Sequence, residues 1–264
     1  MKKNIMKGIC STAITIVFLA SGTLAVSAQT TAATSSSRAA ARAALVVQRL
    51  QNTVNRADQE IARRIAALNA LEGRVNTMQK VSANDKGSLS SMVQSQISAL
   101  NALESKIAGD VNSTSSLKDD IQSITSSYRI YALVIPQGAI EAAADRVMTI
   151  VGAMTTIGTK IQTRISALGS SASASTTAAL ADFNAKIADA TAQAQAAVSE
   201  VSALAPDQGN QTQMQANTSA LKDARSKLQV AQKDLVMARQ DAGVVVKTLE
   251  MFHTTSSSTA TSSQ

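Results

Sequence analysis

The feature that most constrains the fold is an apolar residue at every seventh position. From Val47 onward one such line is entirely apolar, and a second line three residues further on is interrupted by a single arginine. The first line is Val47, Val54, Ile61, Leu68 and Val75, and the second is Leu50, Ala57, Arg64, Leu71 and Met78. Alternating steps of three and four are typical of long helices that pack at shallow angles. Similar lines recur further along the chain, so the sequence predicts an all-α, elongated, mostly antiparallel bundle of coiled-coil-like helices.

Composition argues against a sheet protein. Aromatic residues make up 2% of the chain, and there are two prolines and no tryptophan. Sheets favour aromatic and β-branched residues with frequent turn signals, which this alanine- and serine-rich chain lacks. Long helices are the structure that such a composition favours.

Turn residues divide the chain into predicted segments. Helices are expected over about 36–80, 83–109, 113–135 and 137–168, which together form one bundle over 36–168. Pro136 marks a break or kink, because it lacks a backbone donor and disfavours helical geometry in the residue before it. A linker at 169–173 precedes a helical hairpin over 174–252, and the polar tail 253–264 is expected to be disordered.

The first 28 residues have the pattern of a secretion signal. Three lysines precede an apolar stretch, and Val26–Ala28 supplies the small residues that a signal peptidase recognises. We therefore expect export to the periplasm, the cell envelope or the exterior. The alternative is that this segment is retained as an anchor helix, since it is nearly long enough to span a bilayer. The only cysteine, Cys10, lies inside it, so the exported chain is expected to fold without disulfides.

The inventory of reactive residues argues against an enzyme. The single histidine, His253, falls at the start of the predicted tail, and no glycine-rich phosphate loop is present. Glu141 and Asp145 share a helix face and raise a metal site as an alternative. We favour carboxylates that interact with the helix dipole. The sequence thus predicts no catalytic residue, no cofactor, no metal and no small-molecule substrate.

The clearest asymmetry is a line of arginines at the start of the first predicted helix. Residues 29–64 contain six arginines against two acids, whereas residues 65–264 contain sixteen basic and sixteen acidic residues. Four of the arginines, which we call the arginine strip, are spaced by seven: Arg42, Arg49, Arg56 and Arg63. One interpretation is a solvated face that keeps the protein soluble. The other is a docking strip for anionic lipid headgroups, envelope polymers or an acidic protein. Nucleic acid fits less well, because aromatic residues are not interleaved with the basic ones.

Two further arginines occupy apolar lines, in the matching contexts IARRIAAL and IQTRISAL. Each of these residues, Arg64 and Arg164, either finds a partner within the seam or extends its head into water. We favour the second interpretation for both. Tyr128 and Tyr131 lie on the apolar line of the third predicted helix, and we expect both to pack in the core.

The stretches IQSITSSYRIYALVIPQGAIEAAADRV (121–147) and RADQEIARRIAALNALEGRV (56–75) resemble exported helical proteins that recur in reduced-genome, candidate-phylum bacteria. The similarity covers roughly residues 50–168. It implies export and helicity, and because that group has no assigned activity it implies no site residues.

Two hypotheses for function follow from the sequence. The first is a non-enzymatic structural or interaction protein of the cell envelope, in which a helical scaffold or spacer binds a protein or an anionic envelope surface, and self-association is compatible with it. The alternative is a membrane-active protein, either one like a helical pore-forming toxin or one that binds a lipid surface. The segment IYALVI (130–135) would then be the inserting element, although the charges shortly after it make insertion costly.

Overall fold

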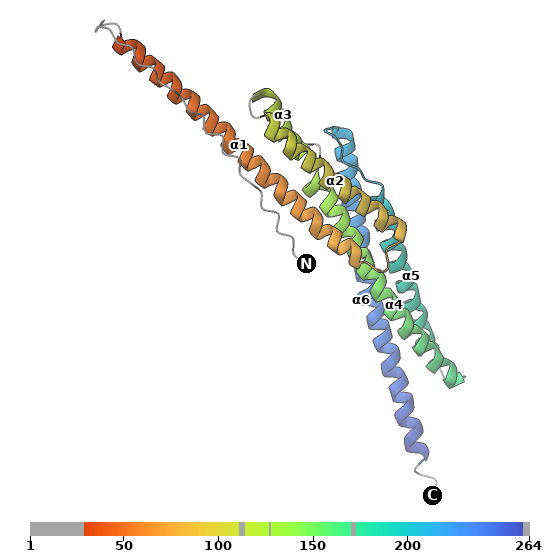
Figure 1. The fold of residues 1–264 in the computed structure, drawn as a ribbon. Coiled ribbons are helices and arrows are strands. Elements are labelled where there is room, and N and C mark those ends of the chain that lie inside the picture. The colour runs from red at the N-terminus through yellow and green to blue at the C-terminus, as the bar shows by residue number, and fades with distance from the viewer. Residues whose placement is uncertain (1–28, 111–113, 127, 170–172, 261–264) are drawn as a thin grey trace, which may run out of the picture. The chain divides into compact units, whose positions relative to one another are not determined.

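A computed structural model gives the fold (Figure 1) and describes the backbone of residues 29–110, 114–126, 128–169 and 173–260, with side chains over 37–110, 115–126, 128–169 and 173–251. These residues form helices and no strand, which confirms the all-α prediction. The elements are α1 (Gln29–Thr77), α2 (Ala83–Gly109), α3 (Thr114–Ser126), the π-helix η2 (Ile130–Val134), α4 (Ile135–Leu168), α5 (Ala174–Ser202) and α6 (Gln211–Ala260). The predicted secretion signal, residues 1–28, lies outside the described residues.

The chain divides into two compact units, residues 1–49 and 50–264. In the first unit α1 is helical from Gln29, and the side chains of residues 37–49 are exposed. Leu45, Val46 and Val47 are among them. The predicted apolar line is therefore not buried at Val47, and its burial begins at Val54 in the second unit.

The second unit has one hydrophobic core to which each of its helices contributes. In α1 and directly after it the buried residues follow both predicted lines, from Val54 and Ala57 to Val75 and Met78. The predicted hairpin corresponds to α5 and α6, which pack against each other and against α4 (Figure 1). Small residues let these helices approach closely, and six alanines of α5 and α6 are fully buried: Ala190, Ala194, Ala197, Ala224, Ala231 and Ala238. The predicted linker thus connects two helices of one compact unit.

Within this unit α1 and α4 run in the same direction. The guanidinium of Arg64 lies over the Tyr131 ring, and seven residues further along both helices Leu71 packs over Gly138. At the next step Asp145 accepts hydrogen bonds from the backbone after α1. α1 and α2 instead run antiparallel, as do α5 and α6 (Figure 1), and hydrogen bonds from Ser90 to Glu72 and from Lys227 to Glu200 join the two pairs.

The break predicted at Pro136 lies earlier in the chain. α3 ends at Ser126, and Arg129 adopts a left-handed conformation with φ 45° before η2 begins. This unfavourable geometry is held by an ion pair of 3.0 Å between Arg129 Nε and Asp207 Oδ2, in the α5–α6 connection. Pro136 falls in the first turn of α4, where a helix does not use the missing N–H.

The C-terminal boundary also differs from the prediction. α6 continues to Ala260, where the sequence predicted a disordered tail from residue 253. Once a long helix has formed, each added residue gains one backbone hydrogen bond, so a Ser/Thr-rich extension can continue it.

Candidate functional site

The four residues of the arginine strip all lie on α1 and are all exposed. Arg42 and Arg49 belong to the unit of residues 1–49, whereas Arg56 and Arg63 belong to the unit of residues 50–264. Residues seven apart share one side of a helix, so Arg42 and Arg49 share one side of α1 within the first unit, and Arg56 and Arg63 share one side within the second.

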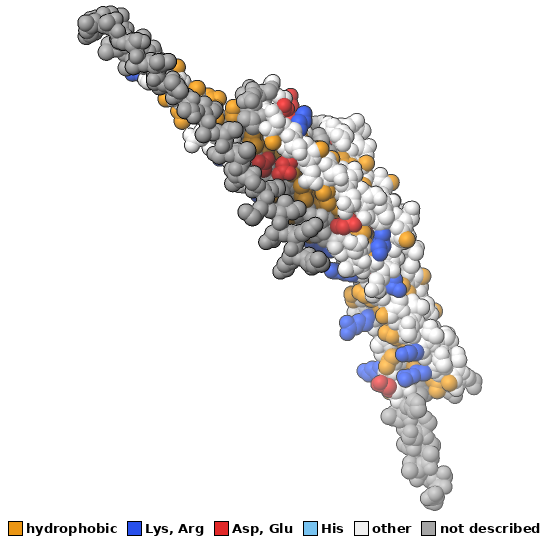
Figure 2. All heavy atoms as spheres, viewed as in Figure 1, with side chains coloured by type: hydrophobic (Ala, Val, Ile, Leu, Met, Phe, Trp, Pro, Cys, Tyr) orange, Lys and Arg blue, Asp and Glu red, His pale blue; other side chains and the backbone are white. Residues whose placement is uncertain are grey.

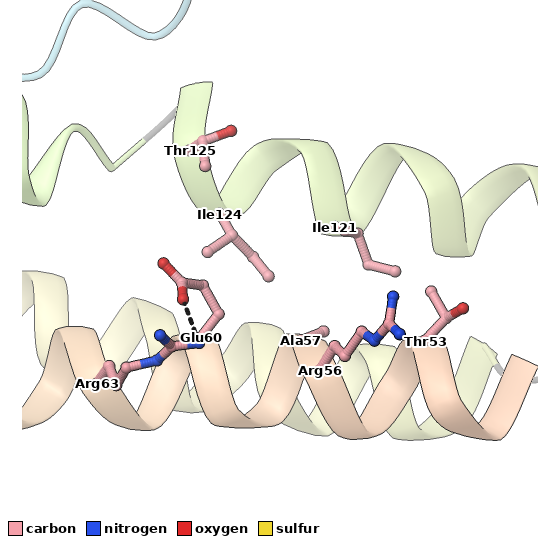
Figure 3. Close-up of a pocket in the computed structure, with 8 residues that line it drawn as sticks. All are labelled: Thr53, Arg56, Ala57, Glu60, Arg63, Ile121, Ile124 and Thr125. Carbon is pink, nitrogen blue, oxygen red and sulfur yellow. Dashed lines mark ion pairs between the residues drawn. The ribbon is translucent and has the colours of Figure 1, made fainter.

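Arg56 and Arg63 also line a groove between α1 and α3 (Figure 3), with a volume of about 390 Å³. We call it the α1–α3 groove. Its apolar part comes from buried Ala57 and Ile124 and half-buried Ile121, and Figure 3 shows both isoleucines extending from α3 toward α1. The complete lining is Thr53, Arg56, Ala57, Glu60, Arg63, Ile121, Ile124 and Thr125. The groove therefore combines an apolar wall with cationic groups at its α1 side.

The charges of the groove are only partly balanced. Glu60 Oε2 accepts from Arg63 Nη2 at 2.9 Å, and Glu60 Oε1 pairs with Arg64 Nη1. One carboxylate thus serves two arginines, and the Arg63 side chain is largely exposed, where an ion pair contributes little. Arg56 forms no ion pair with any described residue. The groove keeps a net positive charge that an anionic group from outside could neutralise.

Arg64 corrects a sequence-based interpretation. Its side chain does not extend into water but is buried, paired with Glu60, with its guanidinium 5.2 Å from the centre of the Tyr131 ring. Tyr131 is in turn half exposed rather than part of the core, because its ring covers the arginine instead. Tyr128 is partly buried and packs against the core, and Arg164 is exposed, as we expected of it. A buried arginine in a seam suits a structural role that fixes the register of α1 against η2.

The two carboxylates that raised a metal site point to different surroundings. Asp145 Oδ1 accepts hydrogen bonds from the backbone N–H groups of Gln79, Lys80 and Val81 at 2.8, 2.5 and 3.1 Å, and so holds the α1–α2 connection. Glu141 is fully buried, and neither of its carboxylate oxygens has a hydrogen-bond partner among the described residues. Within the described part of the chain no group of acidic, histidine or cysteine side chains is arranged to hold a metal ion.

Burial of Glu141 changes its protonation. The pKa of this carboxyl is raised to about 7, mainly because burial removes it from water and also because the charge of Asp85 on α2 is near, while the side-chain amide of Gln137, one turn earlier on α4, acts in the opposite direction. This burial could not be predicted from the sequence, because Glu141 lies one residue after the core position Ile140 and not on an apolar line. Sequence reasoning also missed the α3 wall of the groove, which depends on how α3 packs beside α1.

The remaining positions singled out from the sequence lie partly outside the described residues and partly in the core. The side chain of His253 and all of Cys10 lie outside the described residues. In the segment IYALVI, residues Ile130, Leu133 and Val134 are buried in the core. No described helix has the length and apolar character needed to cross a membrane.

Comparison of the chain with protein-family models, with curated proteins and with solved structures found no match.

Proposed function

We propose that the protein is a non-enzymatic, exported helical scaffold of the cell envelope that binds an anionic partner through α1. The observation that supports this most is the placement of Arg56. It is exposed on the arginine strip, it lines the α1–α3 groove, and it has no ion pair among the described residues. The groove offers a partner an apolar contact beside a positive charge.

An acidic protein segment suits these features better than a free polymer. A polymer of sugars or phosphates would neutralise arginine but gain nothing from Ile121 and Ile124. A helix with acidic residues at heptad spacing could match arginines seven apart and also cover the isoleucines. Export remains part of the proposal because it rests on the pattern of residues 1–28.

The test is a binding measurement with a helical peptide that has glutamate at every seventh position and leucine beside it. Replacement of the strip, R42Q/R49Q/R56Q/R63Q, should weaken binding at least tenfold, since it removes the charges while glutamine preserves helix propensity. The matched control R74Q/K118Q/K222Q/K233Q removes four exposed positive charges elsewhere. Fluorescence anisotropy gives the affinities, and circular dichroism verifies that helicity is unchanged. An equal loss of affinity in both variants would mean that the peptide responds to the total charge of the protein and not to the arginine strip.

A second substitution tests the groove itself. I121S/T125A reduces the apolar contact on α3 without changing any charge and should weaken peptide binding severalfold, whereas binding of polyglutamate without leucine should stay the same. If the strip variant alone has an effect, the partner contacts the arginines and not the groove.

A further inference from the structure

A second surface combines exposed aliphatic residues with unpaired cations, far in sequence from the arginine strip. It begins at a groove of about 310 Å³ between the N-terminal half of α4 and α6. That groove is lined by Ala139 and Ala143 on α4 and by Arg225, Gln229 and Gln232 on α6, among others. Both helices continue well beyond the groove. Residues at steps of seven from its lining residues lie on the same side of each helix, and so they show which side chains follow the groove along α4 and α6.

On α4 the two flanking lines become basic and apolar. Seven-residue steps from Ala139 lead to Arg146, Ala153 and Lys160, and steps from Ala143 lead to Ile150, Ile157 and Arg164. Every one of these six residues is exposed, and Ile150 and Ile157 expose 48% and 44% of their surface. The acids of α4 lie elsewhere, because Glu141 is buried and Asp145 bonds to the α1–α2 connection.

The flank of α6 has the same character. Steps of seven lead from Arg225 through Gln232 to Arg239, and from Gln229 to Val236, which is 58% exposed. The only acid on these lines is Glu250, near the end of the helix. We call the combined surface the α4–α6 face: Arg146, Ile150, Ala153, Ile157, Lys160 and Arg164 with Arg225, Gln229, Gln232, Val236 and Arg239. Figure 2 shows Lys and Arg side chains, with an acidic group beside them, among hydrophobic side chains in the region where Figure 1 places α4 and α6.

None of the five cations of the face forms an ion pair with a described residue, although other lysines and arginines of the unit do, such as Lys106 with Asp120. Exposed aliphatic residues beside unpaired cations mark a surface that gains from contact with something both apolar and anionic. A protein helix packed on this face fits poorly. It would bury Arg225 and Arg239, which lie on the α6 line nearest to α4, and would remove their charges from water. At a bilayer surface the aliphatic side chains can enter the acyl boundary while each cation stays among headgroups.

We propose that the α4–α6 face binds the surface of a bilayer that contains anionic lipids. Ile150, Ile157 and Val236 enter the interface, and the five cations hold the phosphate groups of the lipids. This site is separate from the α1–α3 groove and does not depend on it. The protein lies on the membrane in this mode and does not span it.

The test places a probe on the face and another away from it. The full chain with C10S receives a single cysteine, I157C or V236C on the face or A102C on the exposed side of α2, and an environment-sensitive fluorophore is attached. Each protein is titrated with phosphatidylcholine vesicles, with or without phosphatidylglycerol. We expect blue-shifted, brighter emission at 157 and 236 with the anionic vesicles only, and no change at 102. Equal changes at all three sites, or none at 157 and 236, would overturn the proposal.

Charge variants then separate this site from general attraction. R146S/K160S/R164S should weaken vesicle binding on the order of 100-fold, since each cation near an anionic leaflet contributes substantially. The matched control R74S/K118S/K222S removes the same charge elsewhere and should change the affinity less than threefold. Comparable losses in both variants would contradict a defined face. Soluble polyglutamate should not reproduce the fluorescence shift, and if it does, the ligand is an acidic polymer and not a lipid surface.

Discussion

At the scale of single residues, the charged side chains that the fold partly or wholly buries differ in how well their surroundings stabilise the charge. Asp145 is half-buried, and three backbone N–H groups stabilise its charge, a stronger arrangement than bonds between neutral groups. Arg64 is stabilised by Glu60 and by the Tyr131 ring. Glu141 has no comparable compensation, and so its charge is the one that the fold tolerates least.

Glu141 should therefore make the stability of the protein depend on pH. Its pKa in the folded protein, about 7, lies above its ordinary value of 4.5, so the folded state retains a proton that the unfolded chain releases. This stabilisation is fully present below pH 4.5 and is lost as the pH rises through about 7. The whole change corresponds to about 3 kcal/mol in the free energy of unfolding.

The variant E141Q is neutral at every pH and should not show that decline. Above about pH 8 it should be more stable than the parent protein by roughly 2–3 kcal/mol, while near pH 4.5 the two should be alike. Urea unfolding across this range measures the difference. E104Q, which neutralises an exposed carboxylate on α2, serves as the control and should follow the parent. A decline of the same size in E141Q would show that another group causes it.

At the scale of elements, periodicity predicted the helices well and their junctions less well. α2 agrees with the predicted segment 83–109 because Ser82 caps it, accepting the Asp85 N–H at 3.1 Å, and this signal is local in sequence. The break after α3 was misplaced because it depends on Arg129 pairing with Asp207, seventy-eight residues away. The arginine strip could be predicted because its spacing is local in sequence. The α3 wall of the groove could not be predicted, because it depends on contacts between residues far apart in the chain.

The contact between α1 and α4 offers a test of packing at this scale. A Cβ added at Gly138 would overlap the Leu71 side chain, so G138A should force the helices apart and cost about 1–3 kcal/mol. Gly152 on the same helix has open space around it, and G152A should stabilise the protein by roughly 0.5–1 kcal/mol through helix propensity. Thermal unfolding compares the two. The double variant G138A/L71A should lose less stability than the sum of the losses in G138A and L71A, because the smaller side chain at 71 makes room for the added Cβ. A loss equal to that sum would mean that the two residues do not touch.

At the scale of the whole molecule, the sequence suggested a separate α5–α6 hairpin, because its seams are rich in alanine and bury little area. The structure places α4 against both of these helices, and α5 also reaches α2. The alanine seams allow the backbones to approach closely instead of leaving the hairpin loose.

Phe183, the single buried phenylalanine among the described side chains, adds the large apolar surface that the alanines lack. Its ring lies so close to α4 that a Cβ at Gly158 would be 2.7 Å from Phe183 Cε1. These tertiary contacts could not be predicted from periodicity, which identifies a buried face but not the helix that covers it.

This arrangement predicts that residues 50–264 unfold as one cooperative body. F183A removes a fully buried ring between α5 and α4 and should cost about 3–5 kcal/mol. If the unit is cooperative, the loss should extend beyond α4 and α5, because α2 and α6 can open only when the shared core opens. Native-state hydrogen exchange followed by mass spectrometry should then show the slowest amides of α2 and α6 losing the same free energy of opening. A hairpin that folds independently would give a different result, since exchange would accelerate in α5 and α6 while the slowest amides of α2 kept their protection.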